Sequence, residues 1–253
     1  MDNIEFSGIR SKLYKEALQE YPYARLQDIK LMKKYLAPKK GEVILEVGAG
    51  SGFFSGIISD KLGKTGKLIV TDPSDEQLDD VRFLNKSNIE VYKSGSENIN
   101  LPSNSIDKIW SLGAMHHCFN KQKSFDNFYN CLKSGGTVII IDVFSDSKLA
   151  KHFDERVSKY CITGHEVAFW TKEYAESICY LSGFENPVIK KLNVKWIFDT
   201  REDIGKFLYK LHAMTKTNPK ECLIGAEKIL GVIERKGKFE LNWPMGLIFV
   251  HKK

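Results

Sequence analysis

The sequence predicts an α/β fold in which a mostly parallel sheet is covered by helices on both faces. Short apolar segments that end in turn residues alternate with segments of helical periodicity between residues 41 and 145. Such strands, separated by helices, are typical of parallel sheets, because the crossover helices bury both faces of the sheet. The chain has 253 residues, enough to bury a substantial core without a metal or a disulfide.

The first half of the chain has the clearest order of elements. The strand "VILEV" precedes an apolar helix at about 53–62, and "KLIVT" precedes a helix that Ser74 caps and Gln77 closes as a capping box. Further strands are predicted at 89–93 and 106–111, followed by a helix around "FDNFYNCL". The turn "KSGG" then leads into the long strand "TVIIIDV".

The second half has looser spacing. We expect helices at 148–159 and 171–181, a strand near 187–198, and "MGLIFVH" as the last strand. Two amphipathic helices precede that last strand, and we expect them to form a lid over the carboxyl edge of the sheet. Their apolar positions are Ile204, Phe207, Leu208 and Leu211 in the first, and Leu223, Ala226, Ile229, Leu230 and Ile233 in the second.

Composition indicates an ordinary soluble protein. The apolar fraction is 42% and the charged fraction 28%, and no apolar run approaches the ~20 residues that a membrane span needs. The first residues, "MDNIEFSGIRSKLYKEALQ", lack the apolar core of a secretory signal, so we expect a cytoplasmic protein. Five cysteines with no C-x-x-C pair predict reduced thiols and no bound metal.

The positive charge of the chain is concentrated near its C-terminus. The net charge is +6, and residues 186–253 hold 14 Lys and Arg against 7 Asp and Glu, a surplus of +7. Two interpretations stay open for this quarter of the chain: a solvated basic face, or a surface that binds an anionic acceptor.

The stretch "GEVILEVGAGSGFFSGIISD" combines a buried strand with three glycines spaced two apart. Glycines allow the backbone to approach a ligand closely, and the following helix presents N–H groups to it, so a nucleotide-like cofactor is predicted. The dinucleotide pattern G-x-G-x-x-G would need glycine where the chain has Phe53. Glu46 lies inside the apolar strand and suits a cationic amino group better than a pyrophosphate.

Polar residues follow the next two strands. Asp72 ends the second strand, 20 residues after Gly52, where a carboxylate can accept both hydroxyls of a ribose. Ser96 and Glu97 follow the third strand, where they can meet an adenine edge.

Four segments together carry a family resemblance: "VILEVGAGSG", "TDPS", "GSENINLPSNSIDKIWS" and "GAMHHCFN". In this order they resemble the motifs of class I S-adenosylmethionine-dependent methyltransferases, and more narrowly the small-molecule "type 11" branch that includes ubiquinone methyltransferases. The resemblance is strong over about residues 20–145. It implies a Rossmann-like seven-stranded sheet, mostly parallel, with an antiparallel last strand, helices on both faces and a helical lid.

The resemblance also implies a division of the chain and a set of cofactor contacts. Residues 1–40 would form a helical cap beside the acceptor, 41–145 the core that binds S-adenosylmethionine, and 146–253 the rest of the sheet with a lid at about 200–236. The implied contacts to the cofactor and to its product S-adenosylhomocysteine are Glu46, Gly48, Ala49, Gly50 and Gly52 for the methionine part, Asp72 and Pro73 for the ribose, Ser96 and Glu97 for the adenine, Ser111 and Leu112 near the sulfonium, and Arg25 for the carboxylate.

His116 and His117 follow the fourth strand, where a general base for the acceptor would stand. The alternative is that they satisfy local backbone groups, and Cys118 beside them is interpreted as a small buried hydrophobe. The aromatic residues predicted to line the acceptor pocket are Tyr14, Tyr21, Tyr23, Trp170 and Trp196, with core packing as the alternative role.

Several functions remain open on the sequence alone. The first is methyl transfer from S-adenosylmethionine to a small molecule, through N or O rather than C or S. The alternatives are methylation of RNA by way of the basic C-terminal quarter, a noncatalytic regulatory protein that binds S-adenosylmethionine, and, on the glycine spacing, an NAD-dependent reductase. The sequence leaves the acceptor atom and the oligomeric state open.

Overall fold

The computed structural model describes residues 5–253, which divide into two compact units. Unit 1 consists of the chain up to Lys30 with Val143–Glu166 and Leu192–Met245. Unit 2 consists of Leu31–Asp142, Val167–Lys191 and Gly246–Lys253. The chain therefore passes between the units several times, and α2 (Leu26–Tyr35) begins in the first and ends in the second.

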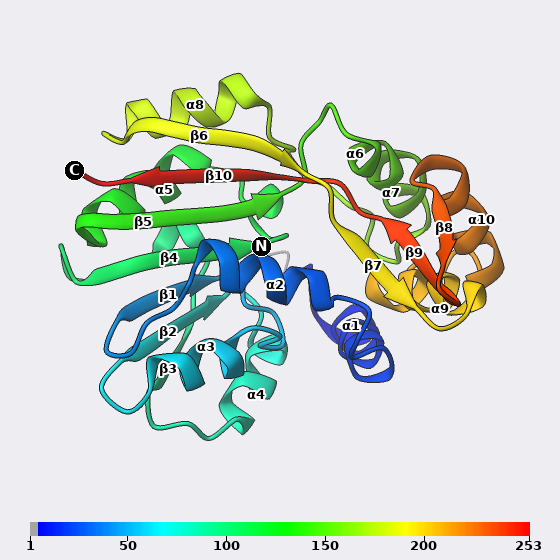
Figure 1. The fold of residues 1–253 in the computed structure, drawn as a ribbon, viewed down its shortest axis with the longest axis horizontal. Helices are drawn as coiled ribbons and strands as arrows, with labels where there is room; N and C mark the ends of the chain where they lie inside the picture. Colours follow the sequence, from blue (N-terminus) through cyan, green and yellow to red (C-terminus); the bar gives the residue numbers. More distant parts are fainter. Residues whose placement is uncertain (1–4) are drawn as a thin grey trace. The chain divides into compact units, whose positions relative to one another are not determined.

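Unit 2 is built on a seven-stranded sheet with the order β3-β2-β1-β4-β5-β10-β6 (Figure 1). The strands are β1 (Val43–Val47), β2 (Lys67–Asp72), β3 (Ile89–Lys93), β4 (Ile106–Leu112), β5 (Leu132–Asp142), β6 (Glu185–Leu192) and β10 (Met245–His251). β1 pairs in parallel with β2 and β4, whereas β10 is antiparallel to β5. The predicted mostly parallel sheet with an antiparallel last strand is confirmed.

The strand order changes direction between β1 and β4. The chain first moves outward from β1 to β3 and then returns to place β4 on the other side of β1. Open α/β sheets bind ligands at the carboxyl ends of the strands beside such a switch point. The loops after β1, β2, β4 and β5 are therefore where a ligand site is expected.

Helices flank this sheet (Figure 1). They are α3 (Ser55–Leu62), α4 (Asp75–Phe83), α5 (Lys121–Cys131) and α8 (Lys172–Leu181), with short 3₁₀ turns η1 (Ser96–Asn98) and η2 (Met115–His117). α3 packs on β2, α4 on β2 and β3, and α5 on β5. Side-chain caps define where several helices begin: the Ser74 hydroxyl accepts a hydrogen bond from Gln77 N, and Asn120 Oδ1 accepts one from Lys123 N.

Unit 1 holds a three-stranded antiparallel sheet in the order β7-β9-β8, together with helices. Its elements are α1 (Gly8–Glu20), α6 (Lys148–His152), the π-helix η3 (Phe153–Val157), α7 (Ser158–Tyr160), β7 (Lys195–Phe198), α9 (Arg201–Leu211), α10 (Pro219–Ile229), β8 (Val232–Arg235) and β9 (Lys238–Asn242). Thr200 and Asp203 form a reciprocal capping box at the start of α9, and Asn218 caps α10.

Three segments of the chain differ from the sequence-based expectation. The strand predicted at 187–198 is two strands, β6 and β7, which belong to different sheets. Ile233, expected on an amphipathic helix, lies in β8 and is 51% exposed, because α10 ends before Gly231, whose φ of +88° is left-handed. The "KSGG" turn lies inside β5.

β5 accommodates the "KSGG" segment as a bulge. Ile106 of β4 is opposite Leu132, but Lys108 is opposite Thr137, so most of the segment has no partner residue on β4. Gly135 has a φ of +76°, and its N–H donates to the carbonyl of Lys252. The extra residues are therefore absorbed within one strand rather than between two elements.

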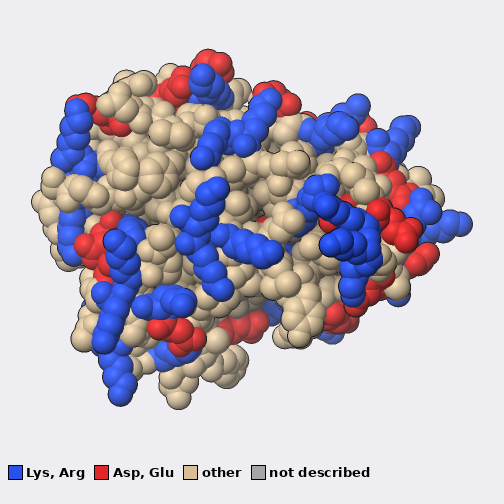
Figure 2. Space-filling model, viewed as in Figure 1, with Lys and Arg blue, Asp and Glu red and all other residues tan. Residues whose placement is uncertain are grey.

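Charged side chains of both signs lie close together on unit 1. Around α10, β8 and β9, acidic groups lie among the Lys and Arg side chains (Figure 2). The ion pairs there include Arg201 with Glu227 and Lys195 with Glu240. Among the helices of residues 5–253, none combines the length and apolar character needed to cross a membrane.

Two helical glycines provide a matched test of packing. A Cβ on Gly205 of α9 would lie 2.2 Å from the carbonyl oxygen of Pro219, whereas a Cβ on Gly56 of α3 would lie 3.8 Å from Leu84. Gly205→Ala should lower the free energy of unfolding by about 2–3 kcal/mol, because α9 and α10 must separate. Gly56→Ala should raise it by about 0.5–1 kcal/mol, because alanine has the higher helix propensity. Urea unfolding of both variants measures the difference; equal effects would contradict the close approach of α9 to α10.

Candidate functional site

The turn after β1 requires glycine at two of its positions. Gly48 has a φ of +66°, and a Cβ there would lie 2.2 Å from the Cβ of Ala114, which belongs to the loop after β4. Gly52 has a φ of +79°, and a Cβ there would lie 2.8 Å from Val81 of α4. The N–H groups of Gly48 and Ala49 donate to the carbonyl of Thr71 on β2. The turn is thus packed tightly between its neighbours, with Gly50 between the two constrained glycines.

Glu46 is a fully buried carboxylic acid on the central strand β1. Its side chain is opposite Val70 of β2 and Trp110 of β4 in the strand register. The hydroxyl of Ser55, near the start of α3, donates to Glu46 Oε2 over 2.6 Å. Burial raises the pKa of Glu46 to about 8, the nearby Asp72 charge acts in the same direction, and the Ser55 hydrogen bond opposes both. Glu46 is therefore protonated at neutral pH until a positive group approaches it.

Asp72 joins the turn after β1 to the turn after β2. Its Oδ2 accepts from Gly50 N and its Oδ1 from Ser74 N, both over 2.9 Å. Burial raises the pKa of Asp72, and the two backbone hydrogen bonds oppose that shift. Because each carboxylate oxygen can accept a second hydrogen bond, the group retains capacity for the hydroxyls of a ligand.

The carboxyl end of β4 offers a buried hydroxyl that has capacity for a ligand. Ser111 is 1% exposed, and its Oγ has no hydrogen-bond partner within residues 5–253. Buried hydroxyls are nearly always hydrogen-bonded in folded proteins. The Ser111 hydroxyl, at the sheet edge where a ligand is expected, therefore suits a polar group of that ligand. Leu112 follows Ser111 and is opposite Ile141 of β5.

The turn η1 places Ser96 and Glu97 beside the loop after β4. Ser96 Oγ donates to Glu97 Oε2 over 3.2 Å, and it accepts from Ser124 Oγ of α5 over 2.8 Å. Glu97 Oε1 accepts from three groups of that loop, at Cys118, Phe119 and Asn120. The predicted contact of this pair with adenine stays a prediction.

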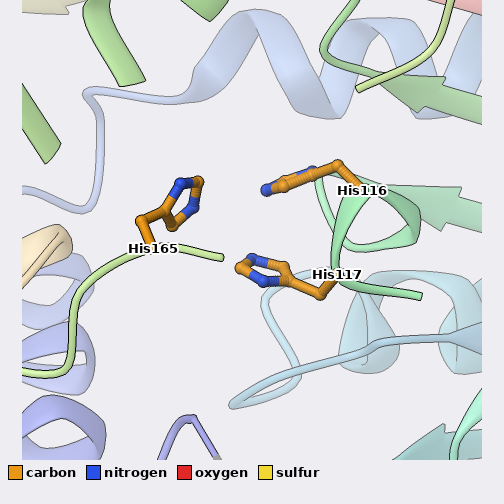
Figure 3. Close-up of side chains that lie close together, drawn as sticks. All are labelled: His116, His117 and His165. Atoms are coloured by element: carbon orange, nitrogen blue, oxygen red, sulfur yellow. The ribbon is translucent and has the colours of Figure 1, made fainter. Parts of the chain in front are cut away.

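The two histidines of the loop after β4 lie close together but differ in their surroundings (Figure 3). His116 is 3% exposed, and its Nδ1 lies 2.5 Å from Asp142 Oδ1. Its backbone N–H donates to Asp142 Oδ2 over 2.9 Å. The ring of His117 lies beside the ring of His116, with centroids 4.2 Å apart. His165, also drawn, belongs to unit 1, where its ring stacks on Phe153.

Asp142 is a residue that the sequence analysis did not single out. It is fully buried at the end of β5 and is 26 residues from His116 along the chain. A carboxylate that accepts Nδ1–H holds the imidazole in the tautomer whose Nε2 carries a lone pair. The sequence contained a signal for it, since an acid ends the apolar run "TVIIID", much as Glu46 lies inside the apolar strand "VILEV".

The remaining predicted residues divide between the units. Trp170 belongs to unit 2, where it is fully buried against Phe125, and its ring faces the ammonium of Lys121. Arg25 belongs to unit 1, where its Nε donates to Asp28 Oδ2 over 2.6 Å. Trp196 donates to the same carboxylate and stacks on Trp243.

The three predicted tyrosines belong to unit 1. The Tyr21 hydroxyl donates to Asp203 over 3.4 Å, and burial together with the Asp203 charge raises its pKa to about 12. Tyr14 packs edge-on against Phe6. Tyr23 is 73% exposed and is the only one of the three that presents most of its ring to solvent. Tyr14 and Tyr21 thus have packing and hydrogen-bond contacts within unit 1, and contact of the three tyrosines with an acceptor stays a prediction.

Unit 2 thus brings Glu46, the glycine turn, Asp72, Ser111 and His116 together at the carboxyl ends of three neighbouring strands. A sequence model described as a methyltransferase domain matches residues 38–202. The chain belongs to the methyltransferase domain family. Enzymes of this family use S-adenosylmethionine as methyl donor.

Curated relatives match over part of their length. An arsenite methyltransferase of Halobacterium salinarum is 26% identical over 190 residues, which are 70% of this chain and 46% of the relative. The ubiquinone/menaquinone biosynthesis C-methyltransferase UbiE of Hydrogenovibrio crunogenus is 24% identical over 46% of this chain and 48% of the relative. The chain spans about half the length of the curated relatives it matches.

Solved structures share the fold. The phosphoethanolamine N-methyltransferase 2 of Haemonchus contortus, solved with S-adenosyl-L-methionine, superposes with a TM-score of 0.68 at 16% identity, covering 99% of this chain and 58% of the other. The YcgJ protein of Bacillus subtilis superposes with a TM-score of 0.64 at 14% identity, covering 90% and 99% of the two chains. At these identities the likeness shows the fold of the methyltransferase domain.

The raised pKa of Glu46 predicts that stability depends on pH. Between the unfolded value near 4.5 and the folded value near 8, the folded protein holds one proton more than the unfolded chain at this position. The free energy of unfolding should therefore fall as pH rises, by about 1.4 kcal/mol per unit from this group. Glu46→Gln should remove that component from urea unfolding curves between pH 5 and 8. An unchanged slope in the variant would contradict a buried, protonated Glu46.

The contact between Gly48 and Ala114 predicts a rescue. Gly48→Ala should lower the free energy of unfolding by about 2–4 kcal/mol, through the clash with Ala114 and the left-handed φ. Adding Ala114→Gly should restore the free energy of unfolding that the clash removes. The loss due to the left-handed backbone at residue 48 should remain. Urea unfolding of the single and double variants forms the cycle, and strict additivity would contradict the contact.

Proposed function

We propose that the chain is an S-adenosylmethionine-dependent methyltransferase that moves a methyl group to a nitrogen or oxygen of a small molecule. The observation that carries this proposal is the His116–Asp142 pair, which stands at the same sheet edge as the glycine turn. The cofactor supplies an electrophilic methyl carbon on a sulfonium. The residues of the chain bind and align the reactants, exclude water and move a proton.

The cofactor contacts follow from the chemistry of the edge. Glu46 would ionise against the ammonium of the methionine part, because an adjacent positive charge reverses the effect of burial on its pKa. Asp72 would accept the ribose hydroxyls with the lone pairs that Gly50 N and Ser74 N leave free. The hydroxyl of Ser111 would meet a polar group near the sulfonium, where it finds the partner that it otherwise lacks within residues 5–253.

His116 is the proposed general base. With its Nδ1–H donated to Asp142, Nε2 can take a proton from an acceptor hydroxyl as its oxygen attacks the methyl carbon, or from an ammonium before its nitrogen attacks. The bond from the methyl carbon to sulfur breaks, and the sulfur leaves as a neutral thioether. Asp142 stabilises the imidazolium that results. Asp142 holds His116 through two contacts, one to Nδ1 and one to the backbone N–H, so the orientation of the imidazole ring is determined before substrate binds. His117, whose ring lies beside it, is the second candidate.

The nature of the acceptor is argued from the same pair and from the cysteines. A base is useful for a hydroxyl or protonated amine, whereas a soft metalloid acceptor needs several thiolates. All five cysteines are buried, and burial raises the pKa of Cys118 to about 11 and that of Cys179 to about 12. The relatives include an arsenite methyltransferase, a C-methyltransferase and an N-methyltransferase, and the base and the protonated thiols favour a nitrogen or oxygen acceptor.

The alternative acceptor is RNA, which the basic C-terminal quarter permits. Part of its charge is neutralised locally: Lys210 pairs with Glu16 and Glu20, and Lys238 pairs with Asp199. Intermingled charges of both signs also mark the surface around β8 and β9 (Figure 2). Phosphate binding needs basic groups that are free to release counterions, so these pairs favour a small molecule.

A transfer assay with labelled cofactor tests the proposal. The protein would be incubated with S-adenosylmethionine carrying a tritiated methyl group and a small-molecule cell extract, and in parallel with total RNA. The proposal expects label in a low-mass product. Label that is released only by ribonuclease would favour the RNA alternative. Binding of S-adenosylmethionine without labelled product from either pool would favour a noncatalytic regulatory protein, and binding of NADH instead would contradict the cofactor assignment.

Asp142→Asn tests the role of the His116–Asp142 pair. The amide presents N–H₂ where Nδ1–H needs an acceptor, so His116 should switch tautomer and lose its Nε2 lone pair. The rate of methyl transfer should fall by about 10²- to 10⁴-fold, while the affinity for S-adenosylmethionine stays within about twofold.

The matched control is Asp60→Asn, at a side chain that is 69% exposed and pairs with Lys86. This variant should leave both the rate and the cofactor affinity unchanged. An equal loss of cofactor affinity and rate in Asp142→Asn would instead assign the carboxylate to the fold of the sheet edge.

A further inference from the structure

The loop between β4 and α5 carries both histidines and is held from two sides. Asp142 of β5 binds its His116 end, as described above. Glu97, on the other side, binds its far end at residues 118–120. Two acidic residues, one at the end of β5 and one in the turn η1, thus hold one loop whose position decides where the histidine rings lie. The contacts of Glu97 have no part in the chemistry proposed so far.

The carboxylate of Glu97 accepts four hydrogen bonds from the chain. Its Oε1 accepts from Cys118 Sγ over 3.1 Å, from Phe119 N over 3.1 Å and from Asn120 N over 3.3 Å. Its Oε2 accepts from Ser96 Oγ over 3.2 Å. A carboxylate that receives two successive backbone N–H groups fixes the path of the main chain, because those groups cannot turn away as a side chain can.

The charge on Glu97 suits this role. Burial alone would raise the pKa of Glu97, but the hydrogen bonds from Cys118, the backbone and Ser96 outweigh it and lower the pKa. The carboxylate is therefore ionised near neutral pH, where its hydrogen bonds are charge-assisted. Glu46 contrasts with it, since burial raises the pKa of that acid to about 8.

Neighbouring contacts make the attachment rigid. Asn127 Nδ2 of α5 donates to the carbonyls of Ser96 and Glu97, and Ser124 Oγ donates to Ser96 Oγ. The buried ammonium of Lys121 donates to the carbonyl of Cys118 over 2.7 Å. The loop, η1 and the first turns of α5 therefore form one hydrogen-bonded block.

We propose that Glu97 is a positioning residue that latches the loop carrying His116 and His117 to the turn after β3. The role in positioning a base rests on the proposed function, whereas the latch itself stands on the contacts of Glu97. Through Ser96, which the same carboxylate contacts, the latch also links the predicted adenine side of the site to the histidines. The alternative is that Glu97 binds the adenine edge directly and the loop contacts are incidental.

The first test needs no acceptor or cofactor. In Glu97→Ala, hydrogen exchange of the Phe119 and Asn120 amides should become at least about tenfold faster, because their acceptor is gone. Alkylation of Cys118 by iodoacetamide should also become faster as the loop opens. Glu97→Gln keeps one acceptor oxygen, so its amide exchange and alkylation rates should lie between those of Glu97→Ala and the unaltered protein. The control Glu90→Gln changes an acid of β3 that pairs with Lys67 at the surface and should leave both rates unchanged.

The second test concerns the histidines and the cofactor. The imidazole ¹⁵N signals of His116 should show one tautomer in the unaltered protein and broadened signals in Glu97→Ala, with S-adenosylmethionine affinity within about threefold by calorimetry. Unchanged amide exchange and unchanged histidine signals would overturn the latch. Loss of cofactor affinity by tenfold or more without faster exchange would overturn it in favour of the adenine contact. If the unaltered protein does not bind S-adenosylmethionine, the proposed function fails, and the exchange data still decide the latch.

Discussion

The chemistry of unit 2 depends on the cost of burying carboxyl groups at the ends of parallel strands. Asp72 and Asp142 end β2 and β5, Glu46 lies one residue before the end of β1, and each is almost entirely buried. A buried acid must be protonated or receive hydrogen bonds, because an isolated buried charge has a large free-energy cost in a medium of low dielectric. The three groups meet this requirement differently. Glu46 keeps its proton beside Ser55, Asp72 receives two backbone N–H groups, and Asp142 receives the ring and the backbone N–H of His116.

These different solutions divide the work of the site. A carboxyl group that is protonated in the free protein responds to a cation, and the proposed partner of Glu46 is the amino group of S-adenosylmethionine. A carboxylate saturated on one side by backbone groups holds two turns together and can still accept ligand hydroxyls. A carboxylate that binds a histidine sets the ring direction and tautomer. The fold of the methyltransferase domain brings these groups to one sheet edge, where the His116–Asp142 pair also bears on the proposed acceptor.

Local signals in the sequence singled out the residues of the proposed cofactor side, and their contact with the cofactor stays a prediction. An acid inside an apolar strand, three glycines spaced two apart and an acid at the next strand end are all readable within a few residues, as at Glu46 and Asp72. The His116–Asp142 pair could not be predicted in the same way, because it depends on β4 and β5 being adjacent in the sheet. The predicted 187–198 strand is divided because its first part pairs in the seven-stranded sheet and its second part in the three-stranded sheet, which depends on strands distant in the sequence. Trp170 and Trp196 could not be separated from core residues by sequence, since packing and ligand contact both select aromatic rings.

The most direct measurement is calorimetric titration with S-adenosylmethionine at pH 6.5 in buffers of different ionisation enthalpy, which counts the protons exchanged on binding. At this pH Glu46 is protonated in the free protein, and an α-amino group is already charged. A carboxyl group that ionises against the bound ammonium should release close to one proton in the unaltered protein and none in Glu46→Gln. Tight binding of S-adenosylmethionine with no proton release by the unaltered protein would contradict the assignment of Glu46 to the ammonium.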